Sequence, residues 1–227
     1  MPAPEIRLNI DNLTCVRGEQ PVFSNLSVEI LSGNNVILRG PNGSGKSSLL
    51  RILAGFLKPF TGHITWNGAD IRQIIDIYRL STHYVGHLEA IKPSLTVNEH
   101  LTFWASAKGM KKPAPSILKA LDLEELANVP ARFLSAGQKR RLSLTRLLAS
   151  PASLWLLDEP LITLDTESTS RLQIILNEHA ASGGLAIIAT HTDVDLLNSL
   201  NIDMRNYSPH VQAIHDTDDT KLGLSRW

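Results

Sequence analysis

The fold of this chain is constrained most by one segment, Gly40-Pro41-Asn42-Gly43-Ser44-Gly45-Lys46-Ser47. It fits the pattern G-x-x-x-x-G-K-[ST] at every fixed position. An apolar run at residues 36–38 precedes it, and residues 47–57 follow with the leucine and isoleucine spacing of a helix. Glycines in such a loop let backbone N–H groups converge on phosphate oxygens, and the helix N-terminus adds partial positive charge. The sequence therefore predicts a strand–loop–helix unit that binds a nucleoside triphosphate.

Two side chains at the end of this loop are expected to contact the phosphates and the metal ion. Lys46 would reach the β- and γ-phosphates, and the hydroxyl of Ser47 would ligate Mg²⁺. A glycine-rich turn with a chance lysine is the alternative interpretation, and the strand before and helix after the loop argue against it. The expected nucleotide-binding residues here are Gly40, Pro41, Asn42, Gly43, Ser44, Gly45, Lys46, Ser47 and Ser48.

The composition limits the class of protein around this loop. The chain has 227 residues, with 43% hydrophobic and 19% charged residues, which indicates one folded domain over 1–227 and excludes wholesale disorder. Lys and Arg number 22, as do Asp and Glu, and the pI near 7.1 argues against a strongly basic nucleic-acid-binding protein. The single cysteine, Cys15, excludes an intrachain disulfide and a cysteine-based zinc cluster, and favours a reducing compartment.

No targeting or membrane-spanning segment is expected. The first residues lack a basic patch followed by an apolar run, so they do not resemble a secretory signal. Apolar runs such as Leu185–Ala189 are far shorter than the roughly 20 residues that cross a bilayer. Any role at a membrane would come through a partner.

The remaining pattern predicts an α/β core with two additions. Residues 6–10 and 26–30 alternate between apolar and polar, which is typical of half-buried antiparallel strands. Strands are also expected around 64–66 and 84–85, and after about residue 200 there is no strong pattern. Between about 88 and 140 the sequence favours an α-helical subdomain, with helices starting at Thr96 and Ser116 and a loop over 108–115.

Acidic residues follow a second buried strand. The run Leu154–Leu157 is apolar on both faces, as in a parallel sheet, and it ends in Asp158-Glu159. Asp158 would hold Mg²⁺ together with Ser47, and Glu159 would polarise the attacking water as a general base. His191 ends the next predicted strand and would lie at the same sheet edge, where we favour a γ-phosphate contact over a structural histidine.

A third motif, Leu134-Ser135-Ala136-Gly137-Gln138, resembles the signature of ATP-binding-cassette (ABC) ATPases. With the phosphate-binding loop, Asp158-Glu159-Pro160, Leu164-Asp165 and His191 in the right order, the resemblance covers residues 5 to about 195. It implies a P-loop NTPase (RecA-like) core of the ABC type. It also implies that two copies of the chain dimerise head to tail, so that the signature of one acts in trans on the ATP of the other.

Two positions depart from the family pattern. His87 stands where the family has a glutamine that couples the γ-phosphate and Mg²⁺ to the transporter; a histidine still hydrogen-bonds, but its charge varies with pH. Arg17 stands where an aromatic residue stacks on adenine. Its guanidinium either stacks on the base or is a solvated surface charge, and the sequence leaves both open.

These departures narrow the resemblance to one family. The chain resembles the ATP-binding subunits of the cytochrome c maturation system, or haem exporter. The resemblance rests on Gly86-His87, the motif at 134–138 with the Lys-Arg-Arg-Leu that follows, the run 154–160 and the overall length. The resemblance implies a peripheral ATPase on the cytoplasmic side of the inner membrane, or the mitochondrial matrix side. Integral membrane subunits would be its partners, passing haem to a haem chaperone. No C-x-x-C-H is present and the histidines are scattered, so direct haem binding is not expected.

Rival interpretations remain. The ATPase of another ABC transporter or of iron–sulfur cluster assembly is the main alternative, and His87 and Arg17 count modestly against it. Translation factors carry two cassettes, and chromosome-maintenance ATPases need a long coiled coil for which the 88 residues between Lys46 and Ser135 leave no room. A module that traps ATP without hydrolysis is disfavoured by the full set of catalytic residues. Nucleic-acid binding through Lys139, Arg140, Arg141 and Arg146 is disfavoured because an exposed helix face explains these charges.

Overall fold

Two β-sheets lie side by side in the structure, a computed structural model that describes residues 6–110, 113–114 and 116–209. The antiparallel sheet has the order β2-β1-β4-β5, and the parallel sheet has the order β6-β7-β8-β3-β9. The strands of the antiparallel sheet are β1 (Arg7–Arg17), β2 (Gln20–Leu31), β4 (Thr61–Trp66) and β5 (Ala69–Asp70). The parallel strands are β3 (Asn35–Arg39), β6 (Thr82–Val85), β7 (Leu154–Asp158), β8 (Leu185–Ala189) and β9 (Ser199–Asp203). The predicted α/β core with an antiparallel part is confirmed.

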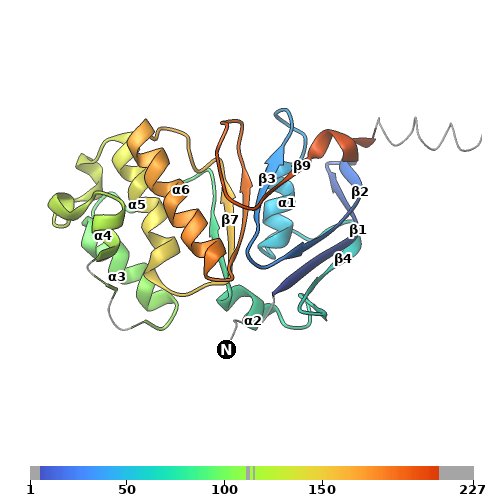
Figure 1. The fold of residues 1–227 in the computed structure, drawn as a ribbon, viewed down its shortest axis with the longest axis horizontal. Coiled ribbons are helices and arrows are strands. Elements are labelled where there is room, and N and C mark those ends of the chain that lie inside the picture. The colour runs from blue at the N-terminus through green and yellow to red at the C-terminus, as the bar shows by residue number, and fades with distance from the viewer. Residues whose placement is uncertain (1–5, 111–112, 115, 210–227) are drawn as a thin grey trace, which may run out of the picture.

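The central strands of the parallel sheet, β3, β7 and β8, are buried on both faces, which explains why they are almost entirely apolar. Because side chains alternate along a strand, Leu154 and Leu156 of β7 pack with helix α1 (Lys46–Leu53) and the antiparallel sheet. Trp155 and Leu157 point the other way, into a second core that they form with helices on the other face of the sheet. Figure 1 shows α1 between the two sheets and α5 and α6 on the opposite side of β7.

The helices of the second core are α3 (Val97–Ala107), α4 (Ser116–Ala120), α5 (Ala136–Ala149) and α6 (Thr166–Ala181). Short 3₁₀ turns at Glu124–Leu126 and Ala131–Phe133 connect α4 to α5. The capping box predicted at Thr96 is confirmed, since its hydroxyl accepts from the backbone of Glu99 and the Glu99 carboxylate accepts in return. The predicted loop over 108–115 lies partly outside the described residues, and the division at about 88–140 stays a prediction.

Some elements differ from the sequence prediction. The helix expected over 47–57 ends at Leu53, because residues 54–57 close in a tight turn with Gly55 at φ +71°. Helix α2 (Ile75–Leu80) was not predicted, and neither were strand β9 and the turn Met204–Tyr207, where no pattern was recognised. Strand β9 lies at the sheet edge with mostly exposed side chains, so it has little apolar signal.

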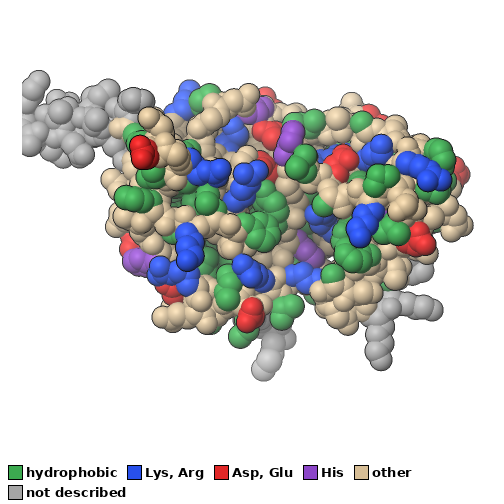
Figure 2. Space-filling model, turned by 180° about the vertical axis from the view of Figure 1, so that it is seen from behind, with side chains coloured by type: hydrophobic (Ala, Val, Ile, Leu, Met, Phe, Trp, Pro, Cys, Tyr) green, Lys and Arg blue, Asp and Glu red, His purple; other side chains and the backbone are tan. Residues whose placement is uncertain are grey.

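The surface mixes charge types. On the face shown in Figure 2, Lys and Arg side chains are interspersed with acidic and hydrophobic ones. Several large hydrophobic side chains of the described residues are exposed, among them Phe56, Phe103 and Phe133. Within the described ranges, no helix is both long and apolar enough to cross a membrane.

Candidate active site

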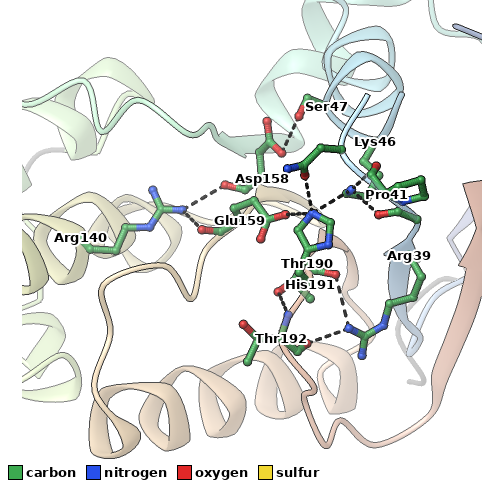
Figure 3. A network of polar contacts seen from close by, with 12 residues as sticks. Arg39, Pro41, Lys46, Ser47, Arg140, Asp158, Glu159, Thr190, His191 and Thr192 are labelled. Atoms are coloured by element: carbon green, nitrogen blue, oxygen red, sulfur yellow. Dashed lines mark hydrogen bonds and ion pairs between the residues drawn. The ribbon is translucent and has the colours of Figure 1, made fainter. Parts of the chain in front are cut away.

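Three neighbouring parallel strands end at one edge of the sheet and bring the predicted motifs together. Strand β3 runs into the loop 40–47, β7 ends in Asp158, and β8, which lies between them, leads to His191. Figure 3 shows Lys46, Ser47, Asp158, Glu159 and His191 converging there. This is the edge at which ligands bind in open parallel sheets.

The loop is held in shape by its glycines and by strand β2. Gly45 is the residue before α1 and has φ +96°. A Cβ on Gly45 would lie 2.7 Å from Cδ1 of Phe23 and 2.9 Å from Cγ1 of Val22, so only glycine fits without rearrangement. The antiparallel sheet therefore supports the phosphate-binding loop from behind.

Lys46 lies at the centre of this edge and is only 7% exposed. Its ammonium donates to the carbonyls of Gly40 at 2.7 Å and Pro41 at 3.1 Å, and lies 3.2 Å from Nε2 of His191. Burial lowers the pKa of Lys46, and the nearby carboxylates of Glu159 and Asp158 oppose that shift. A buried ammonium with two acidic neighbours can bind the oxygens of a phosphate chain.

The side chains of Ser47 and Asp158 lie where they could hold Mg²⁺ together. The Ser47 hydroxyl donates to Oδ1 of Asp158 at 2.9 Å, and Asp158 is 2% exposed. Its second oxygen, Oδ2, is buried and has no hydrogen-bond partner among the described residues. A hydroxyl beside a carboxylate with an unused oxygen is the oxygen donor set that Mg²⁺ prefers, completed by water and phosphate oxygens.

Glu159 and His191 contact each other at the pocket. The His191 Nε2 lies 3.3 Å from Oε1 of Glu159 and 2.9 Å from Oδ1 of Asn42, in addition to its contact with Lys46. Arg39, at the end of β3, donates to the carbonyls of Thr190 at 3.4 Å and Thr192 at 2.8 Å on either side of His191. Arg39 thus holds residues 190–192, the segment that carries His191, next to the phosphate-binding loop. The sequence prediction did not include Arg39.

A pocket of about 520 Å³ opens beside these groups. Its lining contains most of the predicted nucleotide-binding residues, with Val22 and Ile162 added: Val22, Asn42, Gly43, Ser44, Gly45, Lys46, Ser47, Ser48, His87, Glu159, Ile162 and His191. His87 is thus brought into the site, at the end of β6. Arg17 is not among the lining residues and lies exposed at the tip of the β1–β2 hairpin, where it pairs with Gln20.

Comparisons with known proteins agree with this geometry. The sequence profile of the ABC transporter family matches residues 23–162. The cytochrome c biogenesis ATP-binding export protein CcmA of Rhodospirillum rubrum is 44% identical over 200 residues, which cover 88% of this chain and 86% of that protein. The chain belongs to the ABC transporter family, in the group of the CcmA proteins. ABC transporter I family member 1 of Arabidopsis thaliana is 37% identical over 95% of this chain and 96% of its own length.

Solved ABC structures share the fold. An ABC transporter ATP-binding protein from Pyrococcus furiosus superposes with a TM-score of 0.78 at 27% identity, covering 89% of this chain and 99% of that one. A dimeric ATP-binding cassette in a post-hydrolysis state, bound to ADP and Pi, gives a TM-score of 0.72 at 25% identity over 82% of this chain and 88% of its own. The predicted fold class is therefore confirmed as that of an ABC ATPase domain.

The ABC signature, Leu134-Ser135-Ala136-Gly137-Gln138, forms the start of α5 and lies outside the pocket lining. Ser135 caps the helix: its hydroxyl accepts from the Gln138 amide at 3.2 Å, and Gln138 Oε1 accepts from the Ser135 amide at 2.8 Å. Ser135 and Ala136 are exposed. A Cβ on Gly137 would lie 3.0 Å from the Thr163 carbonyl oxygen, so a residue with a side chain would be crowded at this position.

The basic residues after the signature were interpreted wrongly from the sequence as an exposed helix face: Arg140 is buried, and Lys139, Arg141 and Arg146 are partly buried. Arg140 is 3% exposed, not part of an exposed helix face. Its guanidinium donates to the carbonyls of Gly86, Asp158, Glu159 and Pro160 at 2.7–3.1 Å. Burial lowers the pKa of Arg140, and the charges of Glu89, Asp158 and Glu159 oppose the shift. Helical periodicity shows which residues of α5 share a face with Arg140. It does not show that this face packs against the end of β7, because that depends on the tertiary structure.

Proposed function

We propose that this chain hydrolyses ATP to ADP and phosphate at the pocket beside Lys46. The observation that supports it most is the convergence of a buried lysine, a hydroxyl–carboxylate pair and a carboxylate–histidine pair at one sheet edge. Lys46 and the backbone amides of the loop would bind the phosphates. Ser47 and Asp158 would hold Mg²⁺, which neutralises charge on the β- and γ-phosphate oxygens.

Glu159 would act as the general base and His191 as a γ-phosphate contact. The side chain of Glu159 is 16% exposed and lines the pocket next to His191, so a water between it and the γ-phosphate would find a proton acceptor. His191 hydrogen-bonds the same loop that binds the phosphates, through Asn42, and can sense the γ-phosphate. His87 also lines the pocket and would take the position of the family's glutamine.

Replacing the proposed base tests this mechanism. Glu159→Gln is expected to leave ATP binding intact and to lower turnover by roughly 10²-fold or more, because the amide cannot accept the proton of the attacking water. Binding is measured by equilibrium titration with Mg²⁺ and ATP, and turnover by phosphate release. Turnover at the wild-type rate would exclude Glu159 as the base.

A second copy of the chain would complete each site. The N-terminus of α5 is exposed at Ser135 and Ala136, and the signature does not line its own chain's pocket, so this helix end is open to a phosphate held by another copy. Head-to-tail pairing would place it over the partner's ATP. The similarity to a dimeric cassette bound to ADP and Pi supports this arrangement.

The transport process is proposed to be cytochrome c biogenesis. Relatives named as cytochrome c biogenesis ATP-binding export proteins are 39–46% identical over most of this chain. The chain would therefore power haem delivery to a haem chaperone through integral membrane subunits, as a peripheral protein on the cytoplasmic, or matrix, side. Exposed hydrophobic side chains such as Phe103, on α3, are available for contact with such subunits.

Partners can be identified from a trapped complex. Tagged Glu159→Gln protein is purified from native membranes in ATP and Mg²⁺, with Glu159→Gln/Lys46→Ala as a control that does not hold ATP. Co-purification of cytochrome c maturation membrane subunits with the first variant alone would support the proposal. Recovery of another permease or of iron–sulfur assembly proteins would keep the ATPase and refute the haem assignment.

A further inference from the structure

Arg140 connects three parts of the site that are distant in sequence. It lies on α5, five positions after the helix cap Ser135. Nε donates to the Pro160 carbonyl at 3.1 Å, and Nη1 donates to the Gly86 carbonyl at 3.1 Å. Nη2 donates to the carbonyls of Asp158 at 3.1 Å and Glu159 at 2.7 Å, and Figure 3 shows these last two bonds. All three nitrogens of one guanidinium are thus used on backbone oxygens around the catalytic carboxylate.

The backbone that Arg140 holds has an unusual shape. Successive carbonyl groups of an extended strand point to opposite sides, whereas those of Asp158, Glu159 and Pro160 converge on one side chain. The convergence requires the left-handed conformation of Glu159, φ +50°, which is disfavoured for a residue with a side chain. The Glu159 amide donates to the Ala189 carbonyl at 2.8 Å, so this residue is fixed from both sides. Without the guanidinium, an extended backbone at 159 would aim the carboxylate elsewhere.

We propose that Arg140 is a positioning residue for ATP hydrolysis, which holds the backbone of Glu159 so that its carboxylate faces the pocket. This inference rests on the proposed role of Glu159 as the base. Arg140 does not line the pocket beside Lys46, although it lines a smaller adjoining one that shares Glu159 with it. All three of its nitrogens donate to backbone carbonyls, so it acts through Glu159 and not on the nucleotide. Its bond to Gly86 fixes the residue before His87 to the same helix. Glu159 and His87 are thereby held at a set distance from the helix whose N-terminus carries the signature.

Arg141 provides a matched control. It is the next residue of α5, and its guanidinium also donates to two carbonyls, those of Leu121 at 3.2 Å and Asp122 at 2.7 Å, as well as to the Asp122 carboxylate. These partners lie between α4 and the 3₁₀ turn at Glu124–Leu126, away from the pocket. A substitution there removes comparable bonds from the same helix without touching Glu159.

The test compares four variants of the full-length chain, purified together with any membrane subunits that accompany it: Arg140→Gln, Arg140→Lys, Arg141→Gln and Glu159→Gln. Steady-state ATP hydrolysis gives kcat and KM, and equilibrium titration gives ATP affinity. Arg140→Gln is expected to lower kcat about 10-fold or more while KM and ATP affinity change less than about threefold, since only alignment of the base is lost. Arg140→Lys keeps the charge and some of the bonds, and is expected to lose less. Arg141→Gln should retain kcat.

Each result decides between positioning and a general structural role. Wild-type kcat in Arg140→Gln, an equal loss in Arg141→Gln, or a rise in KM with unchanged kcat would overturn the inference. If Arg140→Gln does not fold, Arg140→Lys is judged by the same criteria, with a loss of at least about threefold in kcat required. Normal turnover in Glu159→Gln would instead refute the proposed function, so the two failures are distinguishable.

Discussion

The contact between the phosphate-binding loop and strand β2 allows a quantitative prediction for Gly45→Ala. The added methyl group would lie 2.7 Å from Cδ1 of Phe23 and 2.9 Å from Cγ1 of Val22, closer than carbon atoms pack. Phe23 is 0% exposed and belongs to the core between the sheets, so it has no free space to move into. The backbone at Gly45, with φ +96°, is unfavourable for alanine as well.

The magnitude combines these two effects. A side chain at positive φ costs about 1–2 kcal/mol, and forcing a methyl group into a packed core costs about 1–3 kcal/mol. The free energy of unfolding is therefore expected to fall by about 2–5 kcal/mol, which for a chain of this size lowers Tm by roughly 10 °C. If the loop moves instead to relieve the contact, the amides that bind phosphate move with it and ATP affinity falls.

Gly68→Ala separates backbone strain from packing. Gly68 has φ +84° in the turn between β4 and β5, and a Cβ there would meet nothing within 4 Å. Chemical denaturation gives the free energy of unfolding of each variant, and thermal melts with and without ATP and Mg²⁺ give its stabilisation by nucleotide. Gly68→Ala should lose only about 1–2 kcal/mol and keep the full nucleotide-induced shift in Tm. Equal losses in the two variants would refute the argument that Phe23 and Val22 define the loop.

Two further predictions concern the metal site and a buried histidine. Asp158→Asn is expected to weaken ATP binding about tenfold or more in Mg²⁺ and little in EDTA, which titrations in both buffers measure; equal affinities in Mg²⁺ would exclude Asp158 as a ligand. Burial lowers the pKa of His83 from 6.5 to about 4, so below pH 6.5 the unfolded chain binds more protons than the folded one, and the free energy of unfolding falls as pH falls. Between pH 7 and pH 5 His83 accounts for a loss of about 2 kcal/mol. Because burial also lowers the pKa of His179 to about 4, His83→Gln should still lose stability, but about 2 kcal/mol less than the unsubstituted chain, as urea unfolding at the two pH values would show.

The parts of the site that the sequence could predict are those with strict local spacing. The loop 40–47, the strand ending in Asp158 and the helix cap at Ser135 each combine a fixed motif with the start or end of an element. Local chemistry therefore determines their conformation, and tertiary packing only has to accommodate it. The same local spacing led to the proposal that Ser47 and Asp158 hold Mg²⁺, and the structure brings the two side chains together at 2.9 Å.

Residues whose role depends on tertiary packing could not be predicted. Arg140 belongs to a run of basic residues on a helix, and such a run is usually solvated. It is buried here because α5 packs against β6, which brings the Arg140 guanidinium within hydrogen-bond distance of backbone carbonyls after β6 and at the end of β7. Strand β9 likewise forms because β3 has an open edge, not because its own five residues favour a strand.

The order of the strands explains why one histidine nitrogen can serve the whole site. The sequence places the ends of β3, β7 and β8 at one sheet edge, but such uniformly apolar strands do not specify their neighbours. In the structure β8 pairs with β3 on one side and β7 on the other. His191 therefore emerges between Lys46 and Glu159, at 3.2 and 3.3 Å, and contacts both the proposed phosphate-binding lysine and the proposed general base. If β7 were next to β3, Glu159 would lie beside Lys46 directly, and His191 would be a strand's width, about 5 Å, too far away to contact both.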